Sequence, residues 1–394
     1  MEQEAGNRLR EQELSGVEKR KKGTGTWWKV LLAVVLTLAV CVGGLLLLLG
    51  KNGRALLEGY FLARYAFVEA DADLDDATDQ ALDALVNGLG DRWSYYRNEE
   101  DYQALITRRA NHYVGVGVTV NLQEREEGLL VQAVTKGGPA EAAGIVTGDI
   151  IIAVDGVSIA GDQRQNGSEL ISGEEGSAVT LTILREDGAT LDVSCTRASL
   201  QNPSAAGQML EDDIGYVQLS NFYSGAADSF KEEVDALVSQ GARALVIDLR
   251  NNPGGYIVEL TEILDYLLPE GVVFRQHARW WFETTYESDD ACVDLPFITI
   301  VNADTYSAAE LLSAELKEFC GSPVVGTRTS GKGYSQITFP LANGGAIGLS
   351  TATYCTGSGH SLIGEGITPD VEVELSGTED NQLLAAIELL ERKA

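Results

Sequence analysis

A long hydrophobic stretch, residues 30–50, contains no charged residue. Its length is close to the ~20 apolar residues that a helix needs to cross a bilayer. Trp27 and Trp28 precede it, as interfacial aromatic residues do, and a basic run at residues 19–22 lies on the same side. The pattern predicts a transmembrane helix at 30–50, with residues 1–29 as a cytoplasmic tail and the rest of the chain outside. A cleavable signal peptide is the alternative, but no small-residue cleavage site follows.

The next segment, residues 51–112, has apolar side chains at helical spacing, such as Leu82, Leu85 and Leu89. We expect helices that pack or form a homodimer next to the membrane. An acidic run at residues 69–76 lies between them. It lacks the glycine and the distal glutamate of a calcium loop, so a solvated face is the simpler interpretation.

The period changes to two at residues 113–120 and 129–134, which predicts β-strands. A short helix is predicted at 138–144, and a strand that ends in an Asp-Gly turn is predicted at 148–156. With the glycine-rich loop before it, this mostly β module at 113–198 resembles a PDZ domain of the circularly permuted bacterial type. The resemblance implies that a peptide adds to the sheet as a strand and that its carboxylate binds backbone N–H groups. These would be the groups of Val114, Gly115, Val116 and Gly117.

The last block, residues 199–394, alternates short apolar strands with helices. Strands are predicted at 214–219, 244–248 and 297–301, and the last two lack polar alternation, as expected of strands buried on both faces. The chain is therefore predicted to be a multidomain α/β protein. Reactive groups in such folds gather at the carboxyl ends of the strands.

Charge and composition exclude several function classes. Asp and Glu number 59 and Lys and Arg 29, so the formal charge is −30, which argues against nucleic acid as a partner. The three histidines, His112, His277 and His360, are too few for a His-rich metal site. The five cysteines show no CxxC spacing, which disfavours structural zinc and a disulfide framework. No metal or cofactor is predicted.

Two positions in the last block are candidates for catalysis. Ser307 lies between a strand and a helix, where the helix N-terminus favours developing negative charge. Ser307 and Glu310 also fit an ordinary capping box. Lys332 lies between two glycines, and as a base it would need its pKa lowered from about 10.4 to about 7–8. Gln336 would share a strand face with it. A surface lysine and a solvent-facing glutamine are the simpler alternatives.

Several motifs in order resemble the C-terminal processing (tail-specific) proteases, which pair a PDZ domain with a peptidase core of the Clp protease/crotonase-like type. The motifs lie at residues 90–96, 138–156, 248–255, 307–310, 331–333, 351–354, 364–370 and 380–386. The resemblance implies that Ser307 is the nucleophile, Lys332 the general base and Gln336 the residue that orients Lys332. It further implies an oxyanion hole made by the N–H groups of Ala308 and of a glycine of the run at residues 252–255, of which Gly254 is favoured over Gly255.

The family resemblance and the hydrophobic stretch at 30–50 together predict a membrane-anchored serine endopeptidase of the bacterial cell membrane, with its catalytic domain outside the cytoplasm. Its substrates would be proteins with exposed C-termini. The alternatives are an inactive PDZ scaffold that binds C-termini and an acyl-transferring or crotonase-like enzyme. Ser172 stands where relatives often have a basic residue, which leaves the mode of activation open.

Overall fold

The computed structural model describes residues 27–69, 71–121, 127–279 and 283–393. It divides into two compact units, Met1–Thr78 and Asp79–Ala394. Most of the predicted cytoplasmic tail, residues 1–26, lies outside the described residues.

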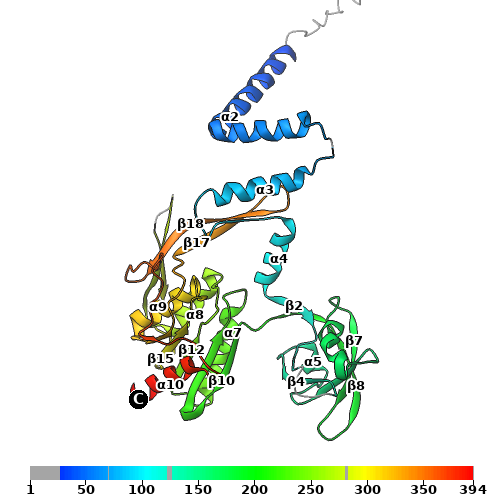
Figure 1. Cartoon of the computed structure of the whole chain (residues 1–394), viewed down its shortest axis with the longest axis vertical. Coiled ribbons are helices and arrows are strands. Elements are labelled where there is room, and N and C mark those ends of the chain that lie inside the picture. Colours follow the sequence, from blue (N-terminus) through cyan, green and yellow to red (C-terminus); the bar gives the residue numbers. More distant parts are fainter. Residues whose placement is uncertain (1–26, 70, 122–126, 280–282, 394) are drawn as a thin grey trace, which may run out of the picture. The chain divides into compact units, whose positions relative to one another are not determined.

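The first unit contains helix α2 (Trp27–Ala66), which includes the predicted span. The backbone leaves the helical conformation at Gly50 (φ 60°, ψ −169°), where the helix axis changes direction (Figure 1). Within α2 an apolar stretch has a mean hydropathy of 2.9 and no buried residue. By length and composition this helix is a candidate membrane span, and a signal sequence meets the same criteria. The homodimer predicted through these helices stays a prediction.

The segment after α2 is mostly helical, as the sequence predicts, but it also contains a short strand. It contains α3 (Leu74–Asn87), the strand β1 (Tyr95–Arg97) and α4 (Glu99–Ala110). β1 pairs antiparallel with β18 (Ala346–Thr356), and the chain from Asp79 onward belongs to the same compact unit as the strands and helices after residue 199. The helices at 51–112 are thus present, the strand β1 was not expected, and the bounds of this segment stay a prediction. Three residues are too few to show a period of two, so the strand leaves no pattern in the sequence.

The PDZ-like region is mostly β, as predicted. Its main sheet has the order β3-β4-β5-β7-β8, with the short β6 beside β5. The strands are β3 (Val118–Asn121), β4 (Leu129–Val134), β5 (Ile150–Val154), β6 (Val157–Ser158), β7 (Ala178–Leu184) and β8 (Thr190–Thr196), and the helical turns are α5 (Pro139–Ala142), η1 (Gly161–Asn166) and α6 (Gly167–Ile171). The Asp-Gly turn after β5 has positive φ at both residues, 48° and 78°, as a type I′ hairpin requires.

The predicted strand at 113–120 is split in two. β2 (His112–Gly115) pairs with β9 (Ala198–Gln201), whereas β3 belongs to the main sheet. The break falls at Gly117, whose φ of 83° favours glycine. The Val116 carbonyl accepts from Ala140 N–H at 2.8 Å and the Gly117 carbonyl from Thr135 N–H at 2.9 Å. Val114 and Gly115 lie in β2 itself, and the carboxylate-binding role of the four residues stays a prediction.

The core is a six-stranded sheet of order β10-β11-β12-β15-β16-β19. β10 is antiparallel to β11 and the other neighbours are parallel. The strands are β10 (Ala205–Met209), β11 (Ile214–Leu219), β12 (Ala244–Asp248), β15 (Phe297–Val301), β16 (Val324–Gly326) and β19 (Val371–Glu372), with the turn η2 (Glu211–Asp213) before β11. The three predicted strands are confirmed as β11, β12 and β15. Every residue of β12 and β15 is buried, which explains their unbroken apolar pattern.

Helices cover both faces of this sheet. The helices α7 (Ala226–Ser239), α8 (Ile257–Leu267) and α9 (Ala308–Cys320) share a buried cluster with Leu245 and Ile247 of β12. Helix α10 (Asn381–Lys393) shares another with Val246. The Arg250 guanidinium joins the end of β12 to the start of α10, because it binds Asp248 at 2.5 Å and Asp380 at 2.7 Å.

A second sheet, of order β1-β18-β13-β14 with β17 paired to β18, stands beside the core. Its further strands are β13 (Gly271–Ala278), β14 (Thr284–Ser288) and β17 (Tyr334–Pro340). The loop before β17 carries Lys332, and the core carries Ser307 at the start of α9. The two predicted catalytic residues therefore lie on different parts of the fold: Ser307 belongs to the core around the first sheet, and Lys332 precedes a strand of the second sheet.

Candidate active site

Ser307 occupies a strained turn between the loop after β15 and helix α9. Its φ of 63° and ψ of −124° are unusual for a residue with a side chain, and such conformations cost about 1–3 kcal/mol. The backbone N–H of Ser307 donates to Glu310 Oε2 at 2.9 Å, which is one half of the predicted capping box. A sharp turn of this kind exposes the hydroxyl at the helix N-terminus, as the strand-to-helix turn does for the nucleophile of α/β-hydrolases.

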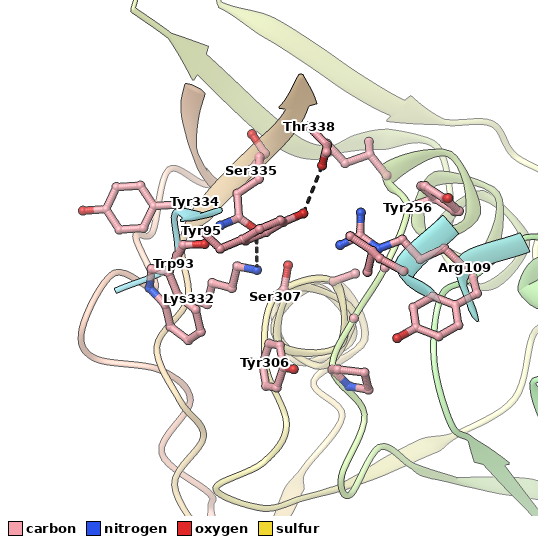
Figure 2. A pocket seen from close by; sticks show the side chains of 18 of the residues that line it. Trp93, Tyr95, Arg109, Tyr256, Tyr306, Ser307, Lys332, Tyr334, Ser335 and Thr338 are labelled. Carbon is pink, nitrogen blue, oxygen red and sulfur yellow. Dashed lines mark hydrogen bonds between the residues drawn. The ribbon is translucent and has the colours of Figure 1, made fainter. Parts of the chain in front are cut away.

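The Lys332 amine points toward the Ser307 hydroxyl (Figure 2). Its Nζ donates to Gln336 Oε1 at 3.0 Å, so the predicted contact between these two residues is present. The amine also lies 5.1 Å from the ring centre of Trp93 and 5.6 Å from that of Tyr306. Among the described residues it makes no hydrogen bond with Ser307.

The surroundings of Lys332 favour its neutral form. Burial lowers the pKa of the amine from 10.5 to about 8, and the positive charge of Arg109 acts in the same direction. The carboxylates of Asp91 and Glu310 oppose the shift. A lysine with a pKa near 8 is within the range of a general base that works close to neutral pH.

Gln336 is itself oriented by a residue that the sequence reasoning did not assign to the site. Its Nε2 donates to the backbone carbonyl of Trp93, which leaves Oε1 as the acceptor for Lys332. Trp93 lies within the motif at 90–96, but the motif gave no sign of a role, because a backbone carbonyl is the same in every residue type. A bulge between Ser335 and Gln336 in β17 accompanies this arrangement.

Glu310 is the second site residue that sequence reasoning missed. Its side chain is fully buried. Oε2 accepts from the N–H groups of Ser307 and Lys332, both at 2.9 Å. Oε1 accepts from Gly331 N–H at 2.7 Å and from the Thr329 hydroxyl at 2.5 Å. One carboxylate therefore holds the backbones of both candidate catalytic residues, although its sequence position suggested only a helix cap.

The positions on either side of Lys332 are glycines because a side chain there would clash with neighbouring atoms. Gly331 has φ 76°, and a Cβ there would lie 3.0 Å from Gly364 C and Gly366 N. A Cβ on Gly333 would lie 2.4 Å from the side chain of Ile363. The loop thus passes between Glu310 and the turn at residues 363–366 with no room for side chains, which fixes where Lys332 leaves the backbone.

The two predicted oxyanion donors are neighbours, but one of them is occupied. A Cβ on Gly254 (φ 76°) would lie 2.9 Å from Ala308 N, so the turn at 253–255 lies against the start of α9. The Gly254 N–H, however, already donates to Asn252 Oδ1 at 2.8 Å. Within the described residues the N–H of Gly255 has no hydrogen-bond partner. The second oxyanion donor, expected from a glycine of residues 252–255 and first of all from Gly254, therefore stays a prediction.

The candidate catalytic groups line one cavity of about 710 Å³. Ser307, Lys332, Gln336, Ala308 and Gly254 belong to its wall. The wall also includes Trp93, Tyr306 and Tyr354, whose hydroxyl donates to the Lys332 carbonyl. The arrangement provides a hydroxyl, a weakly basic amine and backbone N–H groups at one helix N-terminus, the groups that acyl transfer requires.

His360 and the other histidines lie apart from this cavity, since none of them lines it. Ser172 stands where relatives often have a basic residue, and its hydroxyl donates to the Ser168 carbonyl at 3.0 Å. A different cation reaches the same turn: Arg197 is buried and donates to the carbonyls of Leu170 and Ile171 at 2.9 and 2.8 Å.

Comparison with known proteins identifies two regions. Residues 213–373 match the description of peptidase family S41, and residues 130–185 match a PDZ domain. Both lie inside the predicted ranges 199–394 and 113–198, whose ends stay predictions. A solved S41-type protein from Bacteroides fragilis is similar in fold, with a TM-score of 0.50 and 17% identity over 85% of this chain and 96% of that one.

Curated relatives are more similar in sequence. The chain is 30% identical to a carboxyl-terminal-processing protease of Picosynechococcus sp. over 84% of both chains. It is 29% identical to the carboxy-terminal processing protease CtpA of Bacillus subtilis over 77% of this chain, and it spans 65% of that relative's length. The chain therefore belongs to the carboxyl-terminal processing proteases of peptidase family S41, which are serine proteases with a PDZ domain.

Proposed function

We propose that the protein is a serine endopeptidase in which Ser307 is the nucleophile, Lys332 the general base and Gln336 the residue that orients the base. One observation carries the proposal: a buried amine with a lowered pKa, held by Gln336, points at a strained serine hydroxyl in the same cavity. Ser-Lys pairs carry out the same chemistry as the Ser-His-Asp triad without histidine.

The reaction proceeds through an acyl-enzyme. Ser307 Oγ attacks the carbonyl carbon of a peptide bond while its proton moves to neutral Lys332. The tetrahedral intermediate collapses, and the leaving amine takes that proton from Lys332. Water then attacks the acyl group and gives a proton to Lys332. As the second tetrahedral intermediate collapses, Lys332 returns this proton to Ser307 Oγ, which releases the acid product and restores both the hydroxyl and the neutral amine.

Two backbone donors would hold the oxyanion. Ala308 N–H lies at the start of α9, where the helix dipole also favours negative charge. We propose the turn at 253–255 as the source of the second donor. Gly254 N–H would serve if it left Asn252 Oδ1, and Gly255 N–H is the alternative because it is free among the described residues.

The PDZ domain and the hydrophobic helix suggest how substrates reach the site. We propose that the loop at 114–117 binds the C-terminus of a protein substrate. We also propose that α2 remains attached as a single membrane span with residues 1–29 in the cytoplasm, because the basic residues lie before it. The peptidase would then act on proteins outside the cytoplasm of a bacterial cell.

A catalytically inactive scaffold that only binds C-termini is the alternative. The test is incubation of the detergent-purified full chain with an unstructured protein at pH 8.5, followed by mass spectrometry of the products. We expect internal cleavage by the wild type and none by Ser307→Ala. Intact substrate in both samples, together with retained binding of its C-terminus, would favour the scaffold.

Replacement of Gln336 by glutamate is expected to shift the pH dependence of the reaction. A carboxylate 3.0 Å from Nζ in place of the amide oxygen favours the charged lysine. The midpoint at which kcat/KM rises should move upward from near 8 by about one unit or more. Measurement of kcat/KM from pH 6 to 11 for both proteins tests this. An unchanged midpoint would contradict the role of Lys332 as base, while Gln336→Asn is expected to lower the rate without such a shift.

A further inference from the structure

The catalytic cavity is basic although the protein is strongly acidic. Its wall contains one lysine, Lys332, and four arginines: Arg92, Arg97, Arg108 and Arg109. It contains no Asp or Glu, in a chain where acidic residues outnumber basic ones by 59 to 29. The composition of the whole chain would predict more acidic than basic residues in the cavity wall, so the excess of basic residues there needs an explanation.

The charges of these arginines are not neutralised by ion pairs within the described residues. In the parts of the chain that the structure describes, none of the four forms a salt bridge. Arg92 donates to the Ser330 carbonyl at 2.9 Å and lies over the Trp93 ring, and Arg97 lies over the Tyr95 ring. Arg109 lies 6.0 Å from the ring centre of Tyr256, whereas the side chain of Arg108 makes no hydrogen bond or ion pair among the described residues.

Arg108 and Arg109 are the two that are best placed beside the reaction. They belong to the last turn of α4, and in Figure 2 Arg109 lies on the side of Ser307 away from Lys332. The charge of Arg109 contributes to the lowered pKa of Lys332, after the larger effect of burial, so the two cations are near each other. Basic residues in a last helical turn also complement the helix dipole, but that effect does not require them to line a cavity.

The end of α4 is held in place by the core. The Arg109 carbonyl accepts from Ser224 N–H at 3.2 Å. The next residue but one, Asn111, is buried, and its Nδ2 donates to Asn202 O at 2.9 Å and to Ser204 Oγ at 3.0 Å. The backbone that carries the two guanidinium groups is therefore held in place, which suits them for binding a ligand in a defined position.

We propose that Arg108 and Arg109 form an anion subsite that binds a carboxylate of the substrate peptide close to the bond that is cut. The guanidinium group matches a carboxylate geometrically and donates paired hydrogen bonds to it. The carboxylate comes either from the C-terminus of the substrate or from an Asp or Glu side chain near the cut. The subsite rests on the proposed peptidase function and names the substrates that it prefers.

The test uses the full chain and matched peptides derived from a mapped cleavage site. One peptide is neutral and ends in an amide, one ends in a free carboxylate, and the others carry a single Glu at successive positions around the cut. We expect at least one acidic peptide to have a kcat/KM about ten- to a hundredfold higher than the neutral peptide, as charge-assisted hydrogen bonds would give. The peptide whose kcat/KM exceeds that of the neutral peptide shows whether the C-terminus or a side chain supplies the carboxylate.

Two variants assign the effect to the subsite. Arg108→Gln should lower the ratio of acidic to neutral cleavage, and Arg108→Glu should reverse it in favour of a peptide with Lys at the same position. Arg392→Gln, on α10 outside the cavity, is the matched control and should keep the wild-type ratio. Equal cleavage of neutral and acidic peptides by the wild type would overturn the subsite but leave the peptidase intact. Cleavage of no peptide and no unstructured protein would overturn both.

Discussion

Replacement of Lys332 by methionine is expected to abolish proteolysis and, at the same time, to stabilise the protein. Without its base, Ser307 remains a neutral hydroxyl, and kcat/KM should fall about 10⁴-fold or more. Ser307→Ala should fall to the same residual level. The double variant should be no worse than either single variant, because the two residues act in one step.

The stabilisation follows from the buried charge. A pKa lowered from 10.5 to about 8 means that folding disfavours the protonated amine, at about 3 kcal/mol for a difference of this size. Methionine has a similar shape and no charge, so the free energy of unfolding at pH 7 should rise by about 1–3 kcal/mol, after the loss of the Gln336 hydrogen bond.

The pH dependence of this difference has a definite sign. Below about pH 8, Lys332 is protonated in both states and the folded protein carries the full desolvation cost. Between pH 8 and 10.5, the unfolded chain binds the proton and the folded chain does not, so the wild type gains stability as pH rises. Urea unfolding should therefore show that the advantage of Lys332→Met shrinks across this window. A lower stability of the variant at pH 7 would contradict the burial of the amine.

Replacement of Glu310 by glutamine is expected to reduce both activity and stability. Each carboxylate oxygen accepts two hydrogen bonds, so an amide NH₂ group in place of either oxygen would face two donors. We expect a loss of about 2–4 kcal/mol in the free energy of unfolding. We also expect kcat to fall about 10²- to 10³-fold, since small displacements of catalytic groups have effects of this order.

Glu315 supplies a matched control on the same helix. It is also buried, and burial raises its pKa to about 8, so it is largely protonated at neutral pH. One of its oxygens accepts from Gly357 N–H at 3.0 Å. Glu315→Gln should therefore change stability and activity little. If Glu310→Gln kept the wild-type kcat and pH profile and altered stability alone, the carboxylate would only stabilise the fold and would not position Ser307 and Lys332.

The sequence predicts those parts of the fold in which the burial pattern stays the same along a whole strand or helix. Every residue of the strands β12 and β15 is buried, and their sequences show no polar alternation. The helices α7 and α8 each bury residues at helical spacing. The pattern fails where the environment changes within a few residues. Gly117 divides one predicted strand between two sheets, and β1 is too short to show any period.

The candidate site divides in a similar way. Ser307, Lys332 and Gln336 are predictable because their chemistry belongs to the side chain and their positions repeat a family pattern. The Glu310 carboxylate binds backbone N–H groups, and Trp93 contributes its backbone carbonyl. The residue types at these two positions therefore do not reveal their roles in the site. The occupied N–H of Gly254 depends on the rotamer of Asn252, which no sequence pattern records. The arginines of the cavity are visible as residues, but only folding brings α4 beside Ser307.

The most direct test of the central claim is the labelling of Ser307 by a fluorophosphonate as a function of pH, with the modified residue mapped by mass spectrometry. A hydroxyl activated by neutral Lys332 should give a single adduct on Ser307. Its rate of formation should rise with pH to a plateau with a midpoint near 8, and Lys332→Met should remove the reaction. An adduct on another residue, or a labelling rate at Ser307 that does not depend on Lys332, would contradict the Ser-Lys mechanism.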